Sequence, residues 1–281
     1  MKTTKLYILF MLTFAFTLFI AGCEKDKTQS PVESVVEDDI LTSDLFDDIF
    51  AEVEDAMEFM EDGLYGGFKK STEAVTCKTV TIEHPDDSTF WPRTVTIDYG
   101  EGCTAPNGRT RKGKIIIVVN GKFTNENYYR TVTFDNYYVD DFKIEGQKTV
   151  ANEGLNDNGN MYFSIVLTGG KVISPEGKEM TKEYTHYREW IAGSNTPRLR
   201  LDDEYLITGT SEGINRKGIS YKKTILEPLY VTKDCRWIRS GSIEIVAEGK
   251  DDAILDYGDG VCDRIATVTV GEETRTITLH K

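Results

Sequence analysis

Serine and histidine side chains are the first candidates for catalytic chemistry. Residues 209–213 read Gly-Thr-Ser-Glu-Gly, the G-x-S-x-G pattern that can present a nucleophilic serine between a strand and a helix. The residues after Ser211 have turn and strand character, so we interpret this segment as a hairpin loop. His84, His186 and His280 have no spacing that would bring them onto one metal ion. We therefore expect no catalytic residue, no metal and no cofactor, and we interpret the protein as a non-enzyme.

Carboxylates around one glycine-rich turn offer a second kind of chemistry. Asp256, Asp259 and Asp263 flank Gly258 and Gly260, and calcium prefers such oxygen ligands. The same pattern is typical of a bulged β-turn, in which aspartate accepts backbone amides and glycine takes a positive φ. We favour the structural role, and calcium binding is the alternative.

Aromatic side chains are the better candidates for ligand binding. Neighbours such as Tyr128 and Tyr129 must point to opposite faces of a strand, so one ring can enter the core while the other stays outside. Exposed rings can stack on sugars, although aromatic residues are also ordinary components of a sheet. The candidate ligand-binding aromatics are Trp91, Tyr128, Tyr138 and Trp190.

The amino-terminal residues predict export and a lipid anchor. Two lysines precede an apolar run over residues 6–21, which is the pattern of a secretory signal. The run ends in Ile20-Ala21-Gly22-Cys23, which resembles a bacterial lipobox. This resemblance implies a lipoprotein signal peptide over residues 1–22, transfer of diacylglycerol to Cys23, cleavage before it, and acylation (palmitate) of the new amino terminus. An uncleaved membrane anchor is the alternative, for which the run is short.

Four further cysteines favour two disulfides, because an even number in an exported protein is typical of an oxidising compartment. Cys77 and Cys235 are each followed, 21 positions later, by an Asp-Tyr-Gly turn that ends at Cys103 and Cys262, respectively. If each copy of this repeat keeps its own pair, the bridges are Cys77–Cys103 and Cys235–Cys262. A pairing between copies is possible if the copies are spatial neighbours.

The net charge of −14 argues against nucleic acid as a partner. The acidity is concentrated in residues 31–62, which contain thirteen Asp and Glu and no Lys or Arg. Apolar residues recur at every fourth position from Leu45 to Met57, which predicts an acidic amphipathic helix over residues 43–63 after a tether over residues 23–42. We expect the apolar stripe to pack on the main domain and the acidic face to lie in solvent. A free helix that docks a partner is the alternative.

The remainder of the chain has the period-two pattern of strands. Short β-branched and aromatic runs alternate with Asn-Gly and Gly-Gly turns, which predicts an antiparallel β domain over residues 75–281. The expected fold is mainly β, a large antiparallel β-sandwich or an extended β-meander, with one amino-terminal α-helix. Duplicated β modules over about residues 77–122 and 235–281 flank a meander over residues 123–234.

Several motifs of the β domain resemble a family of Bacteroidetes lipoproteins of unassigned function. They are the repeated Asp-Tyr-Gly turns, the basic run from Arg109 to Lys114, residues 202–209, and Cys235-Arg236-Trp237-Ile238. The resemblance covers roughly residues 75–281 and implies the β fold and an envelope location. It implies no activity and no ligand.

These features predict a lipoprotein of the cell envelope, held in the outer membrane by the lipid on Cys23. A charged run over residues 24–27 also resembles a surface-export tag. The leading function is a non-catalytic binding or structural module, with a glycan or an envelope protein as its partner. A carbohydrate-handling surface lipoprotein is the alternative. A glycoside hydrolase, which needs paired carboxylates across a cleft, is the third reading.

Overall fold

The computed structural model describes residues 31–66, 77–84, 90–196 and 199–279. The predicted lipidation site Cys23 and His280 lie outside these residues. Within them the chain forms one α-helix, fourteen strands and one short 3₁₀ helix. Their bounds are α1 (Pro31–Gly66), β1 (Thr79–Glu83), β2 (Arg93–Asp98), β3 (Cys103–Thr104), β4 (Thr110–Val119), β5 (Tyr129–Val139), β6 (Phe142–Leu155), β7 (Met161–Ile173), β8 (Glu179–Ala192), η1 (Arg200–Asp202), β9 (Glu204–Ile214), β10 (Ser220–Thr232), β11 (Ser240–Ala247), β12 (Ala253–Asp259), β13 (Ile265–Val270) and β14 (Glu273–Thr278).

All fourteen strands belong to one antiparallel sheet. Along the main path each strand pairs with the next one in the chain, from β1 to β14, and the short β3 pairs with β4 beside this path. The sheet is open, with β1 and β14 at its two ends. The mainly β prediction is confirmed, and of the two expected arrangements the chain adopts the meander. Such a meander needs only hairpin connections, because antiparallel neighbours are joined by short turns.

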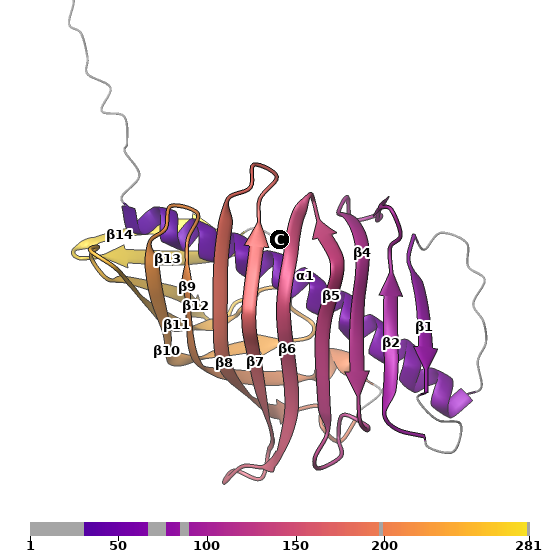
Figure 1. Cartoon of the computed structure of the whole chain (residues 1–281). Helices are drawn as coiled ribbons and strands as arrows, with labels where there is room; N and C mark the ends of the chain where they lie inside the picture. Colours follow the sequence, from indigo (N-terminus) through magenta and orange to yellow (C-terminus); the bar gives the residue numbers. More distant parts are fainter. Residues whose placement is uncertain (1–30, 67–76, 85–89, 197–198, 280–281) are drawn as a thin grey trace, which may run out of the picture.

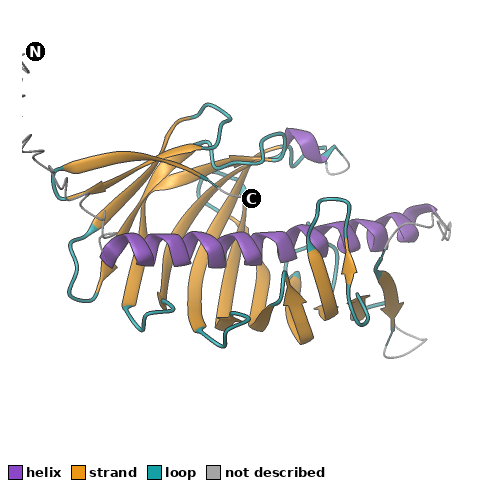
Figure 2. Cartoon of the chain, turned by 90° about the horizontal axis from the view of Figure 1, so that it is seen from above, coloured by secondary structure: helices purple, strands orange, loops and turns teal. Residues whose placement is uncertain are grey.

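The sheet curls round α1, which runs across its concave side (Figures 1 and 2). Long strands must bend to do this, and β6 and β7 change register opposite each other at Gly146 and at Gly169-Gly170. A Cβ atom on Gly146 would lie 2.8 Å from the Cα atom of Gly170. Glycine at position 146 therefore allows these two strands to approach each other closely. The bulge that they form increases the bend of the sheet.

The apolar stripe of α1 is buried in the concave side of the sheet, as predicted. Leu45, Ile49, Val53 and Met57 are each at most 3% exposed. They belong to a core with the inward-facing side chains of β2 to β9, whereas Val35 belongs to a second core with β10 to β13. Full burial of a large apolar side chain is worth roughly 1.5–3 kcal/mol before the loss of entropy is subtracted. This packing makes α1 an integral part of the fold.

The helix begins earlier than the sequence predicted. It starts at Pro31, so residues 31–42 of the expected tether are helical. Proline suits the first turn of a helix because its missing N–H has no partner there in any case. The prediction missed this segment because Asp38 and Asp39, which are buried, interrupt the apolar spacing on which it depended.

The disulfides pair within each copy of the repeat, which confirms that prediction. Cys77 is bonded to Cys103 and Cys235 to Cys262, with Cα–Cα distances of 5.6 and 5.8 Å. The two copies lie at opposite ends of the sheet (Figure 1), where a bridge between copies is excluded by distance. Each bridge closes a loop that contributes about 3.5 kcal/mol in the chain-entropy model.

In both Asp-Tyr-Gly motifs the aspartate accepts a nearby backbone amide, as the sequence favoured, although the second motif lies within β12 and not in a turn. The Asp98 Oδ1 atom accepts the Gly100 N–H at 2.8 Å, and the Asp256 Oδ1 atom accepts the Gly258 N–H at 2.7 Å. Asp263 makes an equivalent contact, to the backbone of the residue two positions later. Among the described residues no three His, Cys, Asp or Glu side chains gather closely enough to share a metal ion.

Candidate functional site

Two of the serine and histidine candidates, Ser211 and His186, lie within strands of the sheet. Ser211 is 4% exposed and lies within β9, so the predicted hairpin loop is wrong. It pairs with Tyr184 of β8 and Lys223 of β10, and a nucleophile elbow would need a helix to follow it. The His186 ring stacks on Tyr184 at 4.4 Å. Burial, reinforced by neighbouring lysines, lowers the pKa of His186 to about 3, which keeps this imidazole neutral.

The four candidate aromatics divide into two groups. Tyr128 and Trp190 are 1% and 4% exposed, and both line one hollow on the concave side of the sheet. Trp91 packs edge-on against Phe90 at 5.4 Å, away from that hollow. Tyr138 carries the ammonium group of a lysine of β4 over its ring. The structure therefore brings together only Tyr128 and Trp190.

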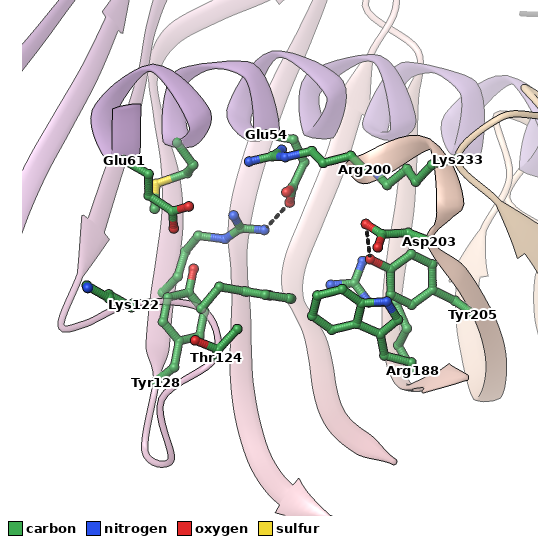
Figure 3. A pocket seen from close by; sticks show the side chains of 14 residues that line it. Glu54, Glu61, Lys122, Thr124, Tyr128, Arg188, Arg200, Asp203, Tyr205 and Lys233 are labelled. Atoms are coloured by element: carbon green, nitrogen blue, oxygen red, sulfur yellow. Dashed lines mark hydrogen bonds and ion pairs between the residues drawn. The ribbon is translucent and has the colours of Figure 1, made fainter. Parts of the chain in front are cut away.

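The hollow has a volume of about 250 Å³ and lies between the carboxyl-terminal half of α1 and the inner face of the sheet (Figure 3). Its lining combines aromatic rings with charged groups of both signs. The lining residues are Glu54, Met57, Glu61, Lys122, Phe123, Thr124, Tyr128, Arg130, Arg188, Trp190, Arg200, Asp203, Tyr205 and Lys233.

The aromatic wall of the pocket is held rigid by its own contacts. Phe123 stacks on Phe163 at 4.3 Å with nearly parallel rings, and its ring centroid lies 5.9 Å from that of Trp190. Trp190 in turn lies 5.8 Å from Tyr205. Because these rings come from the β4–β5 loop, β7, β8 and β9, four segments of the chain fix the shape of the wall.

One ion pair crosses the pocket from the helix to the sheet. The Arg130 guanidinium donates to Glu54 Oε1 at 2.5 Å. Burial alone would raise the pKa of Glu54, but the charges of Arg130, Lys233 and Arg188 outweigh it and lower that pKa well below its ordinary value. Glu54 is therefore ionised, and it occupies only part of the hydrogen-bonding capacity of Arg130.

Buried hydrogen-bond donors beside the hollow lack partners. The Nε atoms of Arg130 and Arg188 and the hydroxyl of Tyr128 are buried and meet no acceptor among the described residues. Buried polar groups in folded proteins are nearly always paired, and an unpaired one costs about 1–3 kcal/mol. Since all three side chains line the hollow, its contents are the available source of the missing acceptors.

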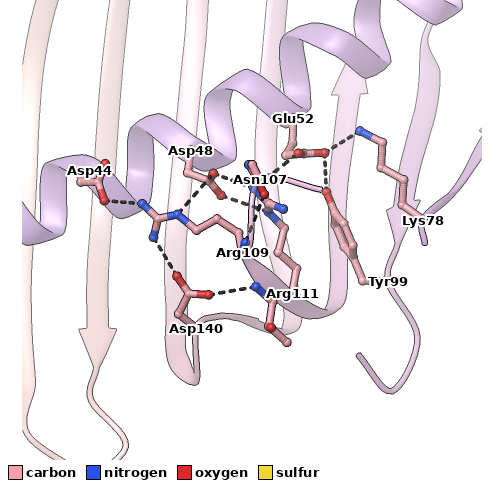
Figure 4. A network of polar contacts seen from close by, with 10 residues as sticks. Asp44, Asp48, Glu52, Lys78, Tyr99, Asn107, Arg109, Arg111 and Asp140 are labelled. Atoms are coloured by element: carbon pink, nitrogen blue, oxygen red, sulfur yellow. Dashed lines mark hydrogen bonds and ion pairs between the residues drawn. The ribbon is translucent and has the colours of Figure 1, made fainter. Parts of the chain in front are cut away.

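The Glu54–Arg130 pair belongs to a row of ion pairs along α1. The prediction that the acidic face of the helix lies in solvent was therefore wrong. The acidic side chains of α1 do not simply face solvent: many pair with basic side chains of the strands and of the segments that connect them (Figure 4). Arg111, for example, binds Asp48 through two nitrogens, at 2.6 and 3.0 Å. The pairs are Asp38–Arg216, Asp39–Lys182, Asp39–Lys223, Asp44–Arg109, Asp48–Arg111, Glu52–Lys78, Glu54–Arg130 and Glu58–Arg200.

The most deeply buried of these contacts surrounds Asp39. This carboxylate accepts from Lys182 at 3.0 Å, from Lys223 at 2.5 Å and from the Tyr221 hydroxyl at 3.3 Å. Asp39 and Lys182 are at most 4% exposed. Burial would raise the pKa of Asp39, but the two lysines outweigh it and hold that pKa below its ordinary value.

The sequence contains a signal for the basic side of these contacts, namely the position of the cations in the alternation of the strands. Arg130 lies two positions from both Tyr128 and Val132, in the phase that faces inward along β5. Lys182 and Arg188 likewise share the phase of the buried Tyr184 in β8. Cations at inward positions of a strand are unusual unless they are paired, so they indicate an acidic partner or ligand under the sheet.

Comparisons with protein-family models, with curated proteins and with solved structures found no match to this chain. Within the described part of the chain, no helix is both long and apolar enough to cross a bilayer. The fold and the site thus define the class of protein: an open antiparallel sheet curled round one helix, with an aromatic and cationic pocket between them.

Proposed function

We propose that this protein is a lipid-anchored binding module of the cell envelope, which holds a small ligand in the pocket between α1 and the sheet. The predicted lipobox that ends at Cys23 supports the anchor, and a surface location remains part of this proposal. The two disulfides support an oxidising compartment outside the cytoplasm. The proposed function is binding, so it requires no chemical conversion of the ligand.

One observation carries the binding role. Buried donors of Arg130, Arg188 and Tyr128 have no acceptor in the described part of the chain, and their side chains line a hollow whose other wall is aromatic. Ligand pockets typically combine an apolar lining with a few well-placed polar groups. The volume of about 250 Å³ suits a molecule of roughly the size of a monosaccharide.

The anchor is tested by the variant Cys23→Ala. We expect it to lose labelling by a fatty-acid probe in cells and to accumulate as an uncleaved precursor, because the thiol that accepts the diacylglycerol is gone. Glu24→Ala is the control and should be labelled and processed like the wild type. Labelling that persists in Cys23→Ala would refute the lipid anchor.

The pocket is tested by the fluorescence of Trp190. The double variant Trp91→Phe/Trp237→Phe keeps Trp190 as its one indole, since the chain has three tryptophans. We expect at least one of galactose, galacturonate, glucosamine and benzoate, at millimolar concentration, to change its emission and raise the melting temperature.

The matched control is Trp190→Phe/Trp237→Phe, in which Trp91 reports from outside the pocket. Its emission should not respond to the same compounds. If none of the four compounds affects the emission of Trp190 or the melting temperature, the pocket is not a binding site for small molecules of this kind and the proposed function fails.

A carbohydrate-handling role is the second candidate, and the aromatic wall favours it. Sugar rings stack on aromatic faces, and Tyr128 and Trp190 were the sequence candidates for that contact. A glycoside hydrolase stays third. Glu54 and Glu61 project from α1, and Asp203 lies on the other side of the pocket (Figure 3). Glu54 is already paired with Arg130 and Asp203 accepts the Tyr205 hydroxyl, whereas hydrolysis needs two carboxyl groups that are available to act on the scissile bond.

A further inference from the structure

We propose that the pocket recognises an oxyanion carried on a ring, and that Arg188 is the group that binds the anion. An acidic monosaccharide and an aromatic carboxylate share this chemistry. The inference rests on the proposed function, since it names the class of ligand for the same pocket. It is carried by the geometry of Arg188, by the charges of the lining and by the aromatic wall.

The Arg188 guanidinium lies among the aromatic rings of the pocket. Its guanidinium carbon lies 4.8 Å from the ring centroid of Tyr205, 5.5 Å from that of Phe163 and 5.6 Å from that of Phe123. Among the described residues it forms no ion pair with a carboxylate, and its Nε atom is buried without an acceptor. The three rings hold the planar guanidinium in place, so that little side-chain freedom remains to be lost when an anion binds.

The charges of the lining favour an anion over a cation. Five cationic side chains line the pocket against three carboxylates, Glu54, Glu61 and Asp203. Glu54 is already paired with Arg130. Burial raises the pKa of Glu61 and of Asp203 and lowers the pKa of Lys233, and Arg200 is paired with Glu58. The lining thus contains more cationic than anionic side chains, which favours an anionic ligand.

The aromatic wall of the pocket is the reason to expect that the ligand carries a ring. The ring centroid of Trp190 lies 5.9 Å from that of Phe123 and 5.8 Å from that of Tyr205, and the Arg188 guanidinium lies over Phe123 and Tyr205. A bare inorganic anion would satisfy the donors but leave the apolar wall uncovered. A ring that carries a carboxylate meets both surfaces at once.

The test measures binding by titration calorimetry with four probes: galacturonate, benzoate, galactose and inorganic phosphate. We expect galacturonate, benzoate or both to bind at least about tenfold more tightly than galactose, because a charged hydrogen bond in a partly dry site contributes that much. Phosphate should bind more weakly than the better ring carboxylate. Which of the two carboxylates binds more tightly identifies the source of the ring.

Two variants with opposite expected effects assign the anion to this site. Arg188→Gln should weaken the better carboxylate by about tenfold or more. Glu61→Gln should strengthen it several-fold, because it removes a negative charge from the lining. Lys114→Gln is the matched control: it also removes one positive charge, but from a surface pair with Asp98, and it should leave affinity unchanged.

The inference and the proposed function fail in different ways. If galactose binds as tightly as the carboxylates, or if Arg188→Gln binds them as tightly as the wild type, the anion inference is refuted while ligand binding stands. If no probe binds, both are refuted. If Arg188→Gln does not fold, the test depends on Glu61→Gln. The inference is overturned if the affinity of Glu61→Gln for the better carboxylate does not rise above that of the wild type.

Discussion

The variant Asp39→Ala is expected to lower the free energy of unfolding by about 3–5 kcal/mol, because it leaves two buried lysines without a counter-charge. Lys182 and Lys223 both donate to this carboxylate, and all three side chains are at least nine-tenths buried. Removing the acid leaves two ammonium groups next to each other without a counter-charge. Chemical denaturation of the purified mature protein, followed by circular dichroism, measures the loss.

The control for Asp39→Ala is Asp55→Ala on the exposed side of the same helix. Asp55 is exposed, and its pKa is raised, first by desolvation and further by Glu52 and Glu58. Its removal should change stability by no more than about 0.5 kcal/mol. The triple variant Asp39→Leu/Lys182→Met/Lys223→Met should recover much of the lost stability, since an apolar replacement needs no pairing. Equal stabilities of Asp39→Ala and wild type would show that the buried triad is not formed.

The variant Ile49→Asp is expected to cost at least about 4 kcal/mol or to prevent folding. Ile49 is 0% exposed in the core between α1 and the sheet. The substitution loses the burial of a large apolar side chain and places a carboxylate where water is excluded. The melting temperature of the purified protein checks it.

Ala51→Asp is the matched control for Ile49→Asp. Ala51 is exposed on the same helix, and the substitution adds the same charge two residues away, so its effect should stay within about 0.5 kcal/mol. A melt of Ile49→Asp identical to that of wild type would mean that α1 leaves the sheet in solution. That outcome would favour the free docking helix over the packed helix that the structure describes.

These variants probe the two ways in which α1 is held. Apolar contacts bury its stripe, and ion pairs connect its acidic positions to cations of the sheet. Buried ion pairs contribute less to net stability than their number suggests, because desolvation offsets the attraction.

The helix, the strands and the disulfides could be predicted from the sequence because each depends on residues that are close together in the chain. The fourfold spacing from Leu45 to Met57 predicted the helix, and alternation predicted the strands. The repeat predicted Cys77–Cys103 and Cys235–Cys262, and each loop is local, with separations of 26 and 27 residues. A meander is itself local, because each strand pairs with the next.

The site was decided by the tertiary structure, because its groups meet only after the sheet has curled. Asp39 lies 184 positions before Lys223, and Glu54 lies 76 positions before Arg130. Composition indicated an acidic helix and a nearly neutral β domain, and nothing in either pattern says that the cations of the strands face the helix. Strand phase placed those cations inward, and bulges such as the one at Gly146 and Gly170 add to the bend that brings the sheet round the helix. An ion pair forms only when its two charged groups lie within a few ångströms of each other, and the curvature of the sheet decides which groups do. Secondary structure, in contrast, follows from the local spacing of apolar residues.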